Sequence, residues 1–282
     1  IFILIGKYVP LQWIKRVIPI REVAEMVRVG VMISLVTLII SSRNLLAQFL
    51  VKRAWQKGNY DRALSRIRML SFGRPSALMI EMEGITHGLA NCPAQAEECY
   101  RAALARALAG ARSQRIRMLG CLAEAMSDQG RNEESQQCRQ NAIEMGDTKV
   151  GTVRAGLATL LLKQGTEPQR ALDLLDEAMR IAKGPAAAKV MPMRLADRAW
   201  ALALLGRRQE AEATIEQALR ALHGSPRLFV ASTHLSIGMA LVAMERTQKA
   251  IEHFRAARDA DPQGKCGARA LNQIKQHSVW GQ

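Results

Sequence analysis

The apolar and polar positions of this chain form one unit that is repeated along most of the sequence. Each copy has a short polar turn, an alanine soon after it, and a second small residue seven positions further on. The clearest turns are Gly58-Asn-Tyr-Asp-Arg-Ala63 and Gly206-Arg-Arg-Gln-Glu-Ala211. Large apolar residues such as Leu175 and Ile215 lie between the small positions, as in a helix with one buried face. The pattern predicts antiparallel helix pairs joined at these turns.

The unit occurs six times between about Gly58 and Pro262. The first small residue of each copy is, in chain order, Ala63, Ala96, Ser135, Ala171, Ala211 and Ala250. Counted between these positions, the spacings are 33, 39, 36, 40 and 39 residues. Internal periods of this size are typical of a solenoid.

Small residues at these places have a direct physical use. Alanine at a crossing point lets two helices approach to about 8 Å, where a larger side chain would separate them. A glycine in the turn accepts the left-handed conformation that a helix end needs. The first helix of most pairs carries a matching small residue seven positions before the turn: Gly84, Ala123, Ala158, Ala199 and Gly238.

Over residues 44–264 these markers resemble the tetratricopeptide-repeat family, through the order Gly, Ala, Tyr or Phe, Ala and Pro. The resemblance implies an all-α fold, an α-solenoid of about six helical hairpins. Three positions depart from the pattern: Val51 replaces a small residue, Ser135 an alanine, and Glu245 the turn glycine. Most units exceed the family's usual 34 residues. We therefore expect extended connections at about 109–114, 146–151, 184–192 and 223–228.

The sequence predicts three segments. Residues 1–42 form a hydrophobic or amphipathic N-terminal segment, which we interpret as a membrane anchor. Residues 43–264 form the six hairpins. Residues 265–282 form a polar capping helix and tail, which a stack of repeats needs for solubility.

The N-terminal segment is the most apolar part of the chain. Residues 29–40 are uncharged and rich in β-branched side chains. A helix extended back to Val23 has 18 residues and is about 27 Å long, close to the thickness of a hydrocarbon core. The residues expected to contact the membrane are Trp13, Ile33, Leu35, Leu38 and Ile39. The alternative is a buried helix that packs on the first hairpin.

Charge and cysteine content bear on partners and compartment. The formal net charge of +15 favours anionic partners, such as acidic proteins, anionic lipid or RNA. The basic residues are dispersed, however, as on a solvated helix exterior. Both flanks of the apolar segment are positive, so charge does not decide which side the repeats face. The five cysteines form no CxxC pair, which favours reduced thiols and cytoplasmic repeats.

No catalytic motif stands out. The sequence has no HExxH, GxSxG, phosphate loop or GxGxxG, and its five histidines are far apart along the chain. We therefore expect no enzymatic activity, no metal, no cofactor and no small-molecule substrate.

In the tetratricopeptide-repeat family the first helix of each hairpin lines a concave groove. Carried over to this chain, the resemblance implies a groove that holds a peptide or helix of a partner protein. The residues implied are Arg117, Glu124, Met193, Trp200, Leu204, Leu235 and Met239. Each apolar member could instead pack between hairpins. The family's carboxylate clamp is not reproduced, because Gln48, Lys52 and Glu81 stand in the first two helices.

These features favour a membrane-associated scaffold that recruits or assembles other proteins, similar to bacterial envelope-assembly factors. Two alternatives remain. The repeats could be the accessory end of a membrane enzyme whose catalytic part precedes Ile1. They could also bind RNA, although the lack of interleaved basic and aromatic residues disfavours nucleic acid.

Overall fold

The computed structural model describes residues 20–71, 75–107, 112–146 and 151–278. Within these ranges the chain is all α-helical and has no strand. It divides into two compact units, residues 1–47 and residues 48–282. The described part of the first unit lies entirely in helix α3, Ile20–Gln56, which continues into the second unit.

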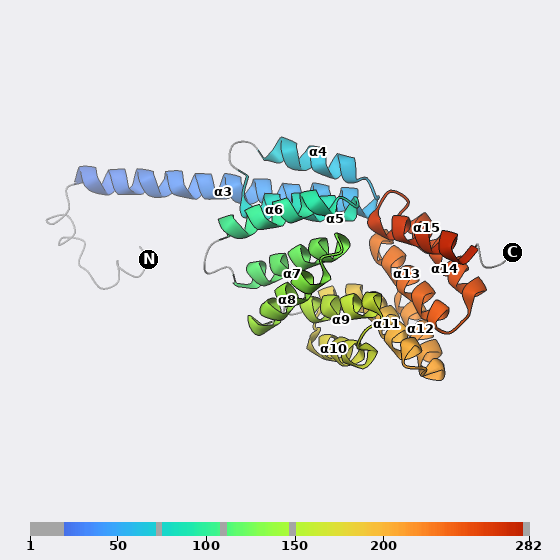
Figure 1. Ribbon diagram of the computed structural model, residues 1–282. Helices are drawn as coiled ribbons and strands as arrows, with labels where there is room; N and C mark the ends of the chain where they lie inside the picture. Colours follow the sequence, from blue (N-terminus) through green and yellow to red (C-terminus); the bar gives the residue numbers. More distant parts are fainter. Residues whose placement is uncertain (1–19, 72–74, 108–111, 147–150, 279–282) are drawn as a thin grey trace. The chain divides into compact units, whose positions relative to one another are not determined.

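The second unit is a stack of six helical hairpins (Figure 1). After the end of α3, the helices in chain order are α4 (Tyr60–Leu70), α5 (Ala77–Leu89), α6 (Pro93–Arg106), α7 (Arg112–Asp128), α8 (Asn132–Glu144), α9 (Thr152–Gln164), α10 (Pro168–Ile181), α11 (Pro185–Leu204), α12 (Arg208–Ala221), α13 (Arg227–Ala243), α14 (Thr247–Ala260) and α15 (Lys265–Ser278). The all-α solenoid is confirmed. Helix α15 follows the last hairpin, over the residues expected to form a capping helix.

The turns within the hairpins all contain a residue in the left-handed conformation. Four are glycines and two are not, and their φ angles are 68° at Gly58, 61° at Asn91, 80° at Gly130, 66° at Gly165, 76° at Gly206 and 64° at Glu245. The six positions are the turn markers predicted from the sequence. A left-handed residue ends one helix and turns the chain into the next.

The small residues lie where helices cross. The first small residue of every second helix, from Ala63 to Ala250, has no exposed surface. In two hairpins an aromatic ring also packs on a glycine of the first helix. A Cβ on Gly84 would lie 2.9 Å from Tyr100, and one on Gly238 would lie 2.3 Å from Phe254. These glycines are therefore required by close packing.

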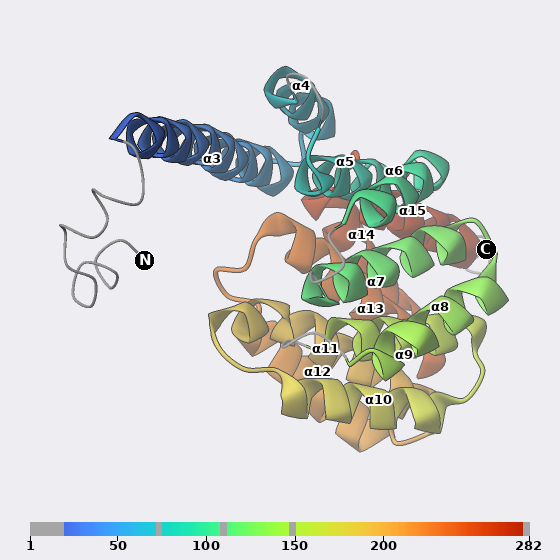
Figure 2. The same cartoon turned by 90° about the vertical axis from the view of Figure 1, so that its left-hand side faces the viewer.

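Contacts between hairpins follow a regular order. First helices contact one another along the series α5, α7, α9, α11 and α13, and each second helix contacts the first helix of the next hairpin. Figure 2 shows these successive layers from the side. The core runs through the stack, with its largest cluster in α9–α15 and a smaller one around Val51 and Ala63.

One expected connection is wrong. The sequence predicted an extended connection at 184–192, but residues 185–204 form a single helix with Pro192 inside it. Pro185 occupies the first turn, where its missing N–H costs nothing, and Pro192 is buried against the core. The extra length of this unit is thus extra helix. The connection expected at 223–228 is present, between Ala221 and Arg227.

The two ends of the second unit meet. The hydroxyl of Tyr60, at the start of α4, donates a hydrogen bond of 2.6 Å to Oδ1 of Asp261, beyond the end of α14. The other carboxylate oxygen of Asp261 accepts from the backbone N–H of Cys266 in the first turn of α15. Asp261 is 2% exposed. The stack of hairpins therefore closes on itself.

Replacement of Glu245 by glycine should stabilise the protein. Its φ of 64° strains a residue that has a Cβ, and its contact with Arg208 is between exposed side chains. We expect Glu245→Gly to raise the free energy of unfolding by about 1 kcal/mol in urea denaturation. Glu252→Gly, at an exposed position inside α14, should lower it by about 1 kcal/mol. Equal effects of the two changes would contradict the argument.

Candidate partner-binding groove

A polar contact joins α5 and α7, the first helices of the second and third hairpins. Arg117 in α7 binds Glu81 in α5 through two hydrogen bonds, of 2.5 Å from Nε and 2.8 Å from Nη2. The Glu81 side chain is almost fully buried, whereas Arg117 is about half exposed. The predicted groove residue Arg117 therefore serves as the partner of a buried carboxylate.

The predicted groove residue Glu124 meets the C-terminal helix. Lys265, at the start of α15, binds Glu124 and lies 3.0 Å from Oδ2 of Asp128. Arg269, one turn later, binds the other oxygen of Asp128. The Asp128 side chain is only 7% exposed. Helix α15 thus lies against the inner face of α7 and bridges the groove with its own cations.

A second polar contact joins three consecutive first helices. Asp197 of α11 accepts hydrogen bonds from Thr159 of α9 at 3.0 Å and from Ser236 of α13 at 2.6 Å. Burial raises the pKa of Asp197, although both hydroxyl groups oppose the shift. The hydroxyl donors satisfy a carboxylate that would otherwise be costly to bury.

The apolar residues predicted for the groove differ in how far they are exposed to solvent. Trp200 is 6% exposed and belongs to the core, so it packs between hairpins. Leu204 is 38% exposed at the end of α11. Met193, Leu235 and Met239 are half-buried, and the last two pack against the core cluster. Among these residues, Leu204 therefore offers the most exposed apolar surface.

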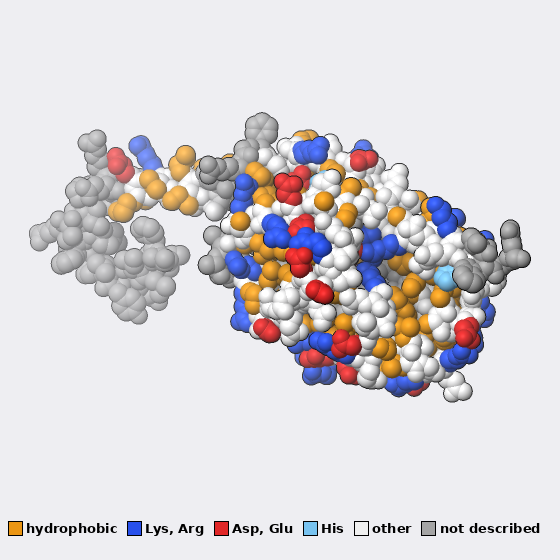
Figure 3. Space-filling model, in the orientation of Figure 1, with side chains coloured by type: hydrophobic (Ala, Val, Ile, Leu, Met, Phe, Trp, Pro, Cys, Tyr) orange, Lys and Arg blue, Asp and Glu red, His pale blue; other side chains and the backbone are white. Residues whose placement is uncertain are grey.

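Lys and Arg side chains gather at a hollow near the centre of the face shown in Figure 3. Lys163, on α9, is exposed, and partial desolvation together with the nearby Arg269 and Lys265 lowers its pKa to about 8. Lys265 lowers the pKa of Glu124 well below its usual range. For Lys265, burial acts against protonation, but Glu124 and Asp128 raise its pKa. The groove thus has a charged centre.

Two histidines that are far apart along the chain meet in the sixth hairpin. Nδ1 of His234 in α13 lies 2.8 Å from Nδ1 of His253 in α14. At this distance one ring donates and the other accepts, so the pair is stable only while at least one ring is neutral. Burial and then the charge of His234 lower the pKa of His253 to about 4. Sequence reasoning missed this pair, although the two positions face each other across the hairpin.

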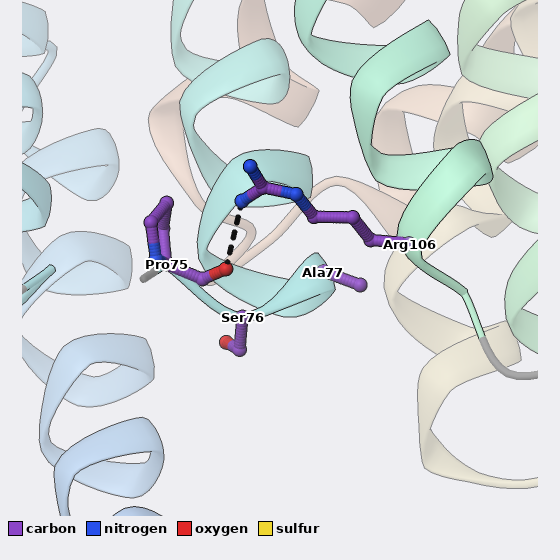
Figure 4. Close-up of a pocket in the computed structure, with 4 residues that line it drawn as sticks. All are labelled: Pro75, Ser76, Ala77 and Arg106. Carbon is purple, nitrogen blue, oxygen red and sulfur yellow. Dashed lines mark hydrogen bonds between the residues drawn. The ribbon is translucent and has the colours of Figure 1, made fainter. Parts of the chain in front are cut away.

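Catalytic chemistry has little support among the described residues. No group of three or more His, Cys, Asp or Glu side chains there could hold a metal ion. A cavity of about 370 Å³ is lined by Pro75, Ser76, Ala77 and Arg106, and Figure 4 shows the hydrogen bond of 3.1 Å from Arg106 to the Pro75 carbonyl. A second, of about 310 Å³, is lined by polar residues of α8 and by Arg170. Neither contains a histidine, a cysteine or a pair of carboxylates.

Burial makes three of the described thiols poor nucleophiles. It raises the pKa of Cys99 and Cys266 to about 11 and that of Cys121 to about 12. The five cysteines are free.

The predicted membrane-contacting residues that the structure describes all lie on α3 and are exposed: Ile33 by 60%, Leu35 by 49%, Leu38 by 66% and Ile39 by 64%. Trp13 lies outside the described residues. By length and composition alone, residues 25–56 of this helix could cross a membrane, with a mean hydropathy of 1.8 in its most apolar window. This is a weak indication of membrane contact.

Comparison with known proteins identifies the repeat. The model of the tetratricopeptide repeat matches residues 231–263, which contain most of α13 and all of α14. No curated protein sequence matches the chain. The molecule is a helical-hairpin solenoid. More particularly, its sixth hairpin matches the tetratricopeptide repeat, and the stack as a whole is similar to solenoids of that repeat.

One solved structure shares this fold at low sequence identity, and others are similar to a lesser degree. The crystal structure of the APC/C hetero-tetramer Cut9–Hcn1 matches with a TM-score of 0.56 and 14% identity, over 84% of this chain and 45% of that chain. This chain therefore spans less than half of that relative. BtubC from P. vanneervenii matches with a TM-score of 0.44 and 20% identity, over 86% and 92% of the two chains. YrrB, described as a tetratricopeptide-repeat protein with an unusual peptide-binding site, matches with a TM-score of 0.39 and 19% identity, over 76% and 98%.

Removal of the Asp128 charge should release α15. Two cations of α15 bind this carboxylate, and an uncharged side chain would leave both without their buried partner. We expect Asp128→Asn to cost about 2–4 kcal/mol in urea denaturation and to speed hydrogen exchange of the α15 amides. Asp259→Asn removes an exposed carboxylate that pairs with Arg258 and should cost less than about 0.5 kcal/mol. Unchanged exchange in α15 of Asp128→Asn would disprove the bridge.

The histidine pair should make stability depend on pH. An unfolded histidine gains a proton near pH 6.5, whereas folded His253 resists it until about pH 4. Protonation therefore favours the unfolded chain as pH falls from 6.5 to 4, with a loss on the order of 2 kcal/mol. His253→Asn should flatten this part of the stability profile, measured by urea denaturation at each pH. His223→Asn, which changes an exposed histidine, should leave the slope as it is.

Proposed function

We propose that this protein is a non-enzymatic scaffold that holds partner proteins in the groove of its repeats and is brought to a membrane by its N-terminal segment. The observation that supports the proposal is the chemistry of the first helices, which would line such a groove. They carry exposed apolar surface at Leu204 and the carboxylate of Glu124, which binds Lys265. Partner helices and extended peptides are recognised by such mixed surfaces.

Arg117, Glu124, Met193, Leu204, Leu235 and Met239 are the residues we propose for partner contact, with Trp200 as support beneath them. Leu204 is the most exposed of the apolar members. The absence of a catalytic motif in the sequence supports a binding role, and repeat scaffolds use extended concave surfaces in this way.

The membrane half of the proposal rests on α3. Nine of its apolar side chains are exposed: Met26, Val27, Val29, Val31, Met32, Ile33, Leu35, Leu38 and Ile39. An aqueous environment would not favour such a surface. Basic residues lie on both sides of this apolar stretch, and anionic lipid headgroups would attract them. We propose that the repeats face the cytoplasm, since the chain has free thiols. We propose that the N-terminal segment ends at residue 42, so that the buried Ala47 and Val51 belong to the first hairpin.

The test is co-purification of proteins from native membranes, combined with membrane flotation of the full chain. Leu35→Arg with Ile39→Arg should release the chain from the membrane fraction, because each arginine costs about 3 kcal/mol in a spanning helix. Leu204→Glu should leave the chain in the membrane but reduce the yield of co-purified partners at least about fivefold.

Matched variants separate these effects from a general loss of solubility or fold. Met69→Arg and Leu271→Glu change residues that are 63% and 40% exposed and lie outside both surfaces. They should behave as the wild-type chain in both measurements. If the double-arginine variant stays in the membrane fraction, the N-terminal segment is not a membrane anchor. If Leu204→Glu captures the same partners in the same yield, the proposed groove does not bind them.

A further inference from the structure

Two histidines occupy a facing pair of positions in the sixth hairpin. His234 lies four positions before Gly238 on α13, and His253 lies three positions after Ala250 on α14. Nδ1 of His234 is 2.8 Å from Nδ1 of His253, and the centroids of the two rings are 5.1 Å apart. The two residues are 19 positions apart along the chain, so the contact joins the two helices of one hairpin.

The corresponding pair in the other hairpins is an ordinary packing contact. In the third hairpin the thiol of Cys138 lies 3.5 Å from the carbonyl oxygen of Leu119. In the second hairpin Cys99 packs against the cluster that contains Ile80. From the second hairpin to the sixth, the pairs are Ile80 with Cys99, Leu119 with Cys138, Arg154 with Leu174, Leu195 with Thr214, and His234 with His253. Only the sixth hairpin has two metal-ligating side chains at these positions, and packing alone does not require two imidazoles.

The two rings have only each other as polar partners in the part of the chain that the structure describes. Neither has a further hydrogen bond or an ion pair with a carboxylate there. Both are half-buried, and burial lowers the pKa of each, that of His253 to about 4. Both rings are therefore neutral at pH 7, and a neutral imidazole has the nitrogen lone pair that binds a metal ion.

The spacing of the two Nδ1 atoms fits one coordination geometry. Two metal–nitrogen bonds of about 2.0 Å that meet at a right angle place their nitrogens about 2.8 Å apart, as observed between His234 and His253. A tetrahedral angle would require about 3.3 Å, and a linear arrangement about 4 Å. Right angles between neighbouring ligands are typical of square-planar Ni²⁺ and Cu²⁺ sites, whereas Zn²⁺ sites are tetrahedral.

We propose that His234 and His253 form a binding site for a divalent transition-metal ion with square-planar coordination, of the class of Ni²⁺ and Cu²⁺. The two Nδ1 atoms take neighbouring ligand positions, and water takes the others. When the ion binds, two of its water ligands leave and two metal–nitrogen bonds form. The ring that carried its proton on Nδ1 releases it to solvent and takes one up on Nε2, so both rings stay neutral.

The bound ion would link α13 to α14. The unfolded chain does not hold the two rings together, so the ion binds the folded hairpin and stabilises it. This consequence goes beyond the scaffold function proposed above and does not depend on it.

The test is isothermal titration calorimetry of the full chain in detergent, without an affinity tag and with Ni²⁺ as the probe. Ni²⁺ is chosen because, unlike Cu²⁺, it does not oxidise free thiols. Wild-type protein should bind one Ni²⁺ per chain. At about one hundred times the dissociation constant, Ni²⁺ should raise the melting temperature by about 3 °C or more, and EDTA should reverse the rise.

Single substitutions in the pair remove one ligand each. His234→Asn and His253→Asn should each weaken Ni²⁺ binding at least about tenfold and lose the rise in melting temperature. The rise is measured against each variant's own melting temperature in EDTA, so a less stable fold is not mistaken for a lost ligand. His223→Asn changes an exposed histidine outside the pair and should bind Ni²⁺ as the wild-type chain does.

Three results would overturn the proposal. Wild-type affinity for Ni²⁺ in His234→Asn and His253→Asn would show an adventitious ion only, and so would an equal loss of affinity in His223→Asn. Tighter binding of Zn²⁺ than of Ni²⁺ would contradict the right-angle geometry. These measurements use the metal ion alone, so their failure leaves the capture of partners from membranes as a separate question.

Discussion

Close approach of helices at small side chains is the interaction on which the second unit depends. Ala63, Ala96 and their equivalents are fully buried where helices cross. Gly84 and Gly238 have no Cβ, and this leaves room for an aromatic ring of the second helix. Each crossing removes apolar surface from water. The left-handed turn residues reverse the direction of the chain, so that the next helix can pack on the one before it. The inner face exists only because these crossings align the first helices.

Much of this fold was predictable from the sequence because its causes are local. The six turn markers required left-handed residues, and the alanines required close neighbours. Both requirements can be read within one hairpin, so the number and order of hairpins followed. The error at 184–192 has the opposite origin. The extra length of this unit suggested an extended connection, but burial of α11 against the core stabilises a long helix around the internal Pro192.

The candidate site was less accessible to prediction because it is assembled from distant parts of the chain. Glu124 was expected in the groove, but its partner Lys265 comes 141 positions later. The contacts of Tyr60 with Asp261 and of His234 with His253 likewise depend on how hairpins stack and close.

Closure by Asp261 has an evolutionary consequence. Open solenoids gain or lose repeats readily, since each unit contacts only its neighbours. Here one carboxylate caps α15 and also accepts the hydroxyl of Tyr60, with Gly264 and Gly267 leaving no room for a larger residue beside it. Duplication or deletion of any internal hairpin would carry Tyr60 away from that carboxylate. A change in the number of hairpins would therefore cost the protein this closing contact.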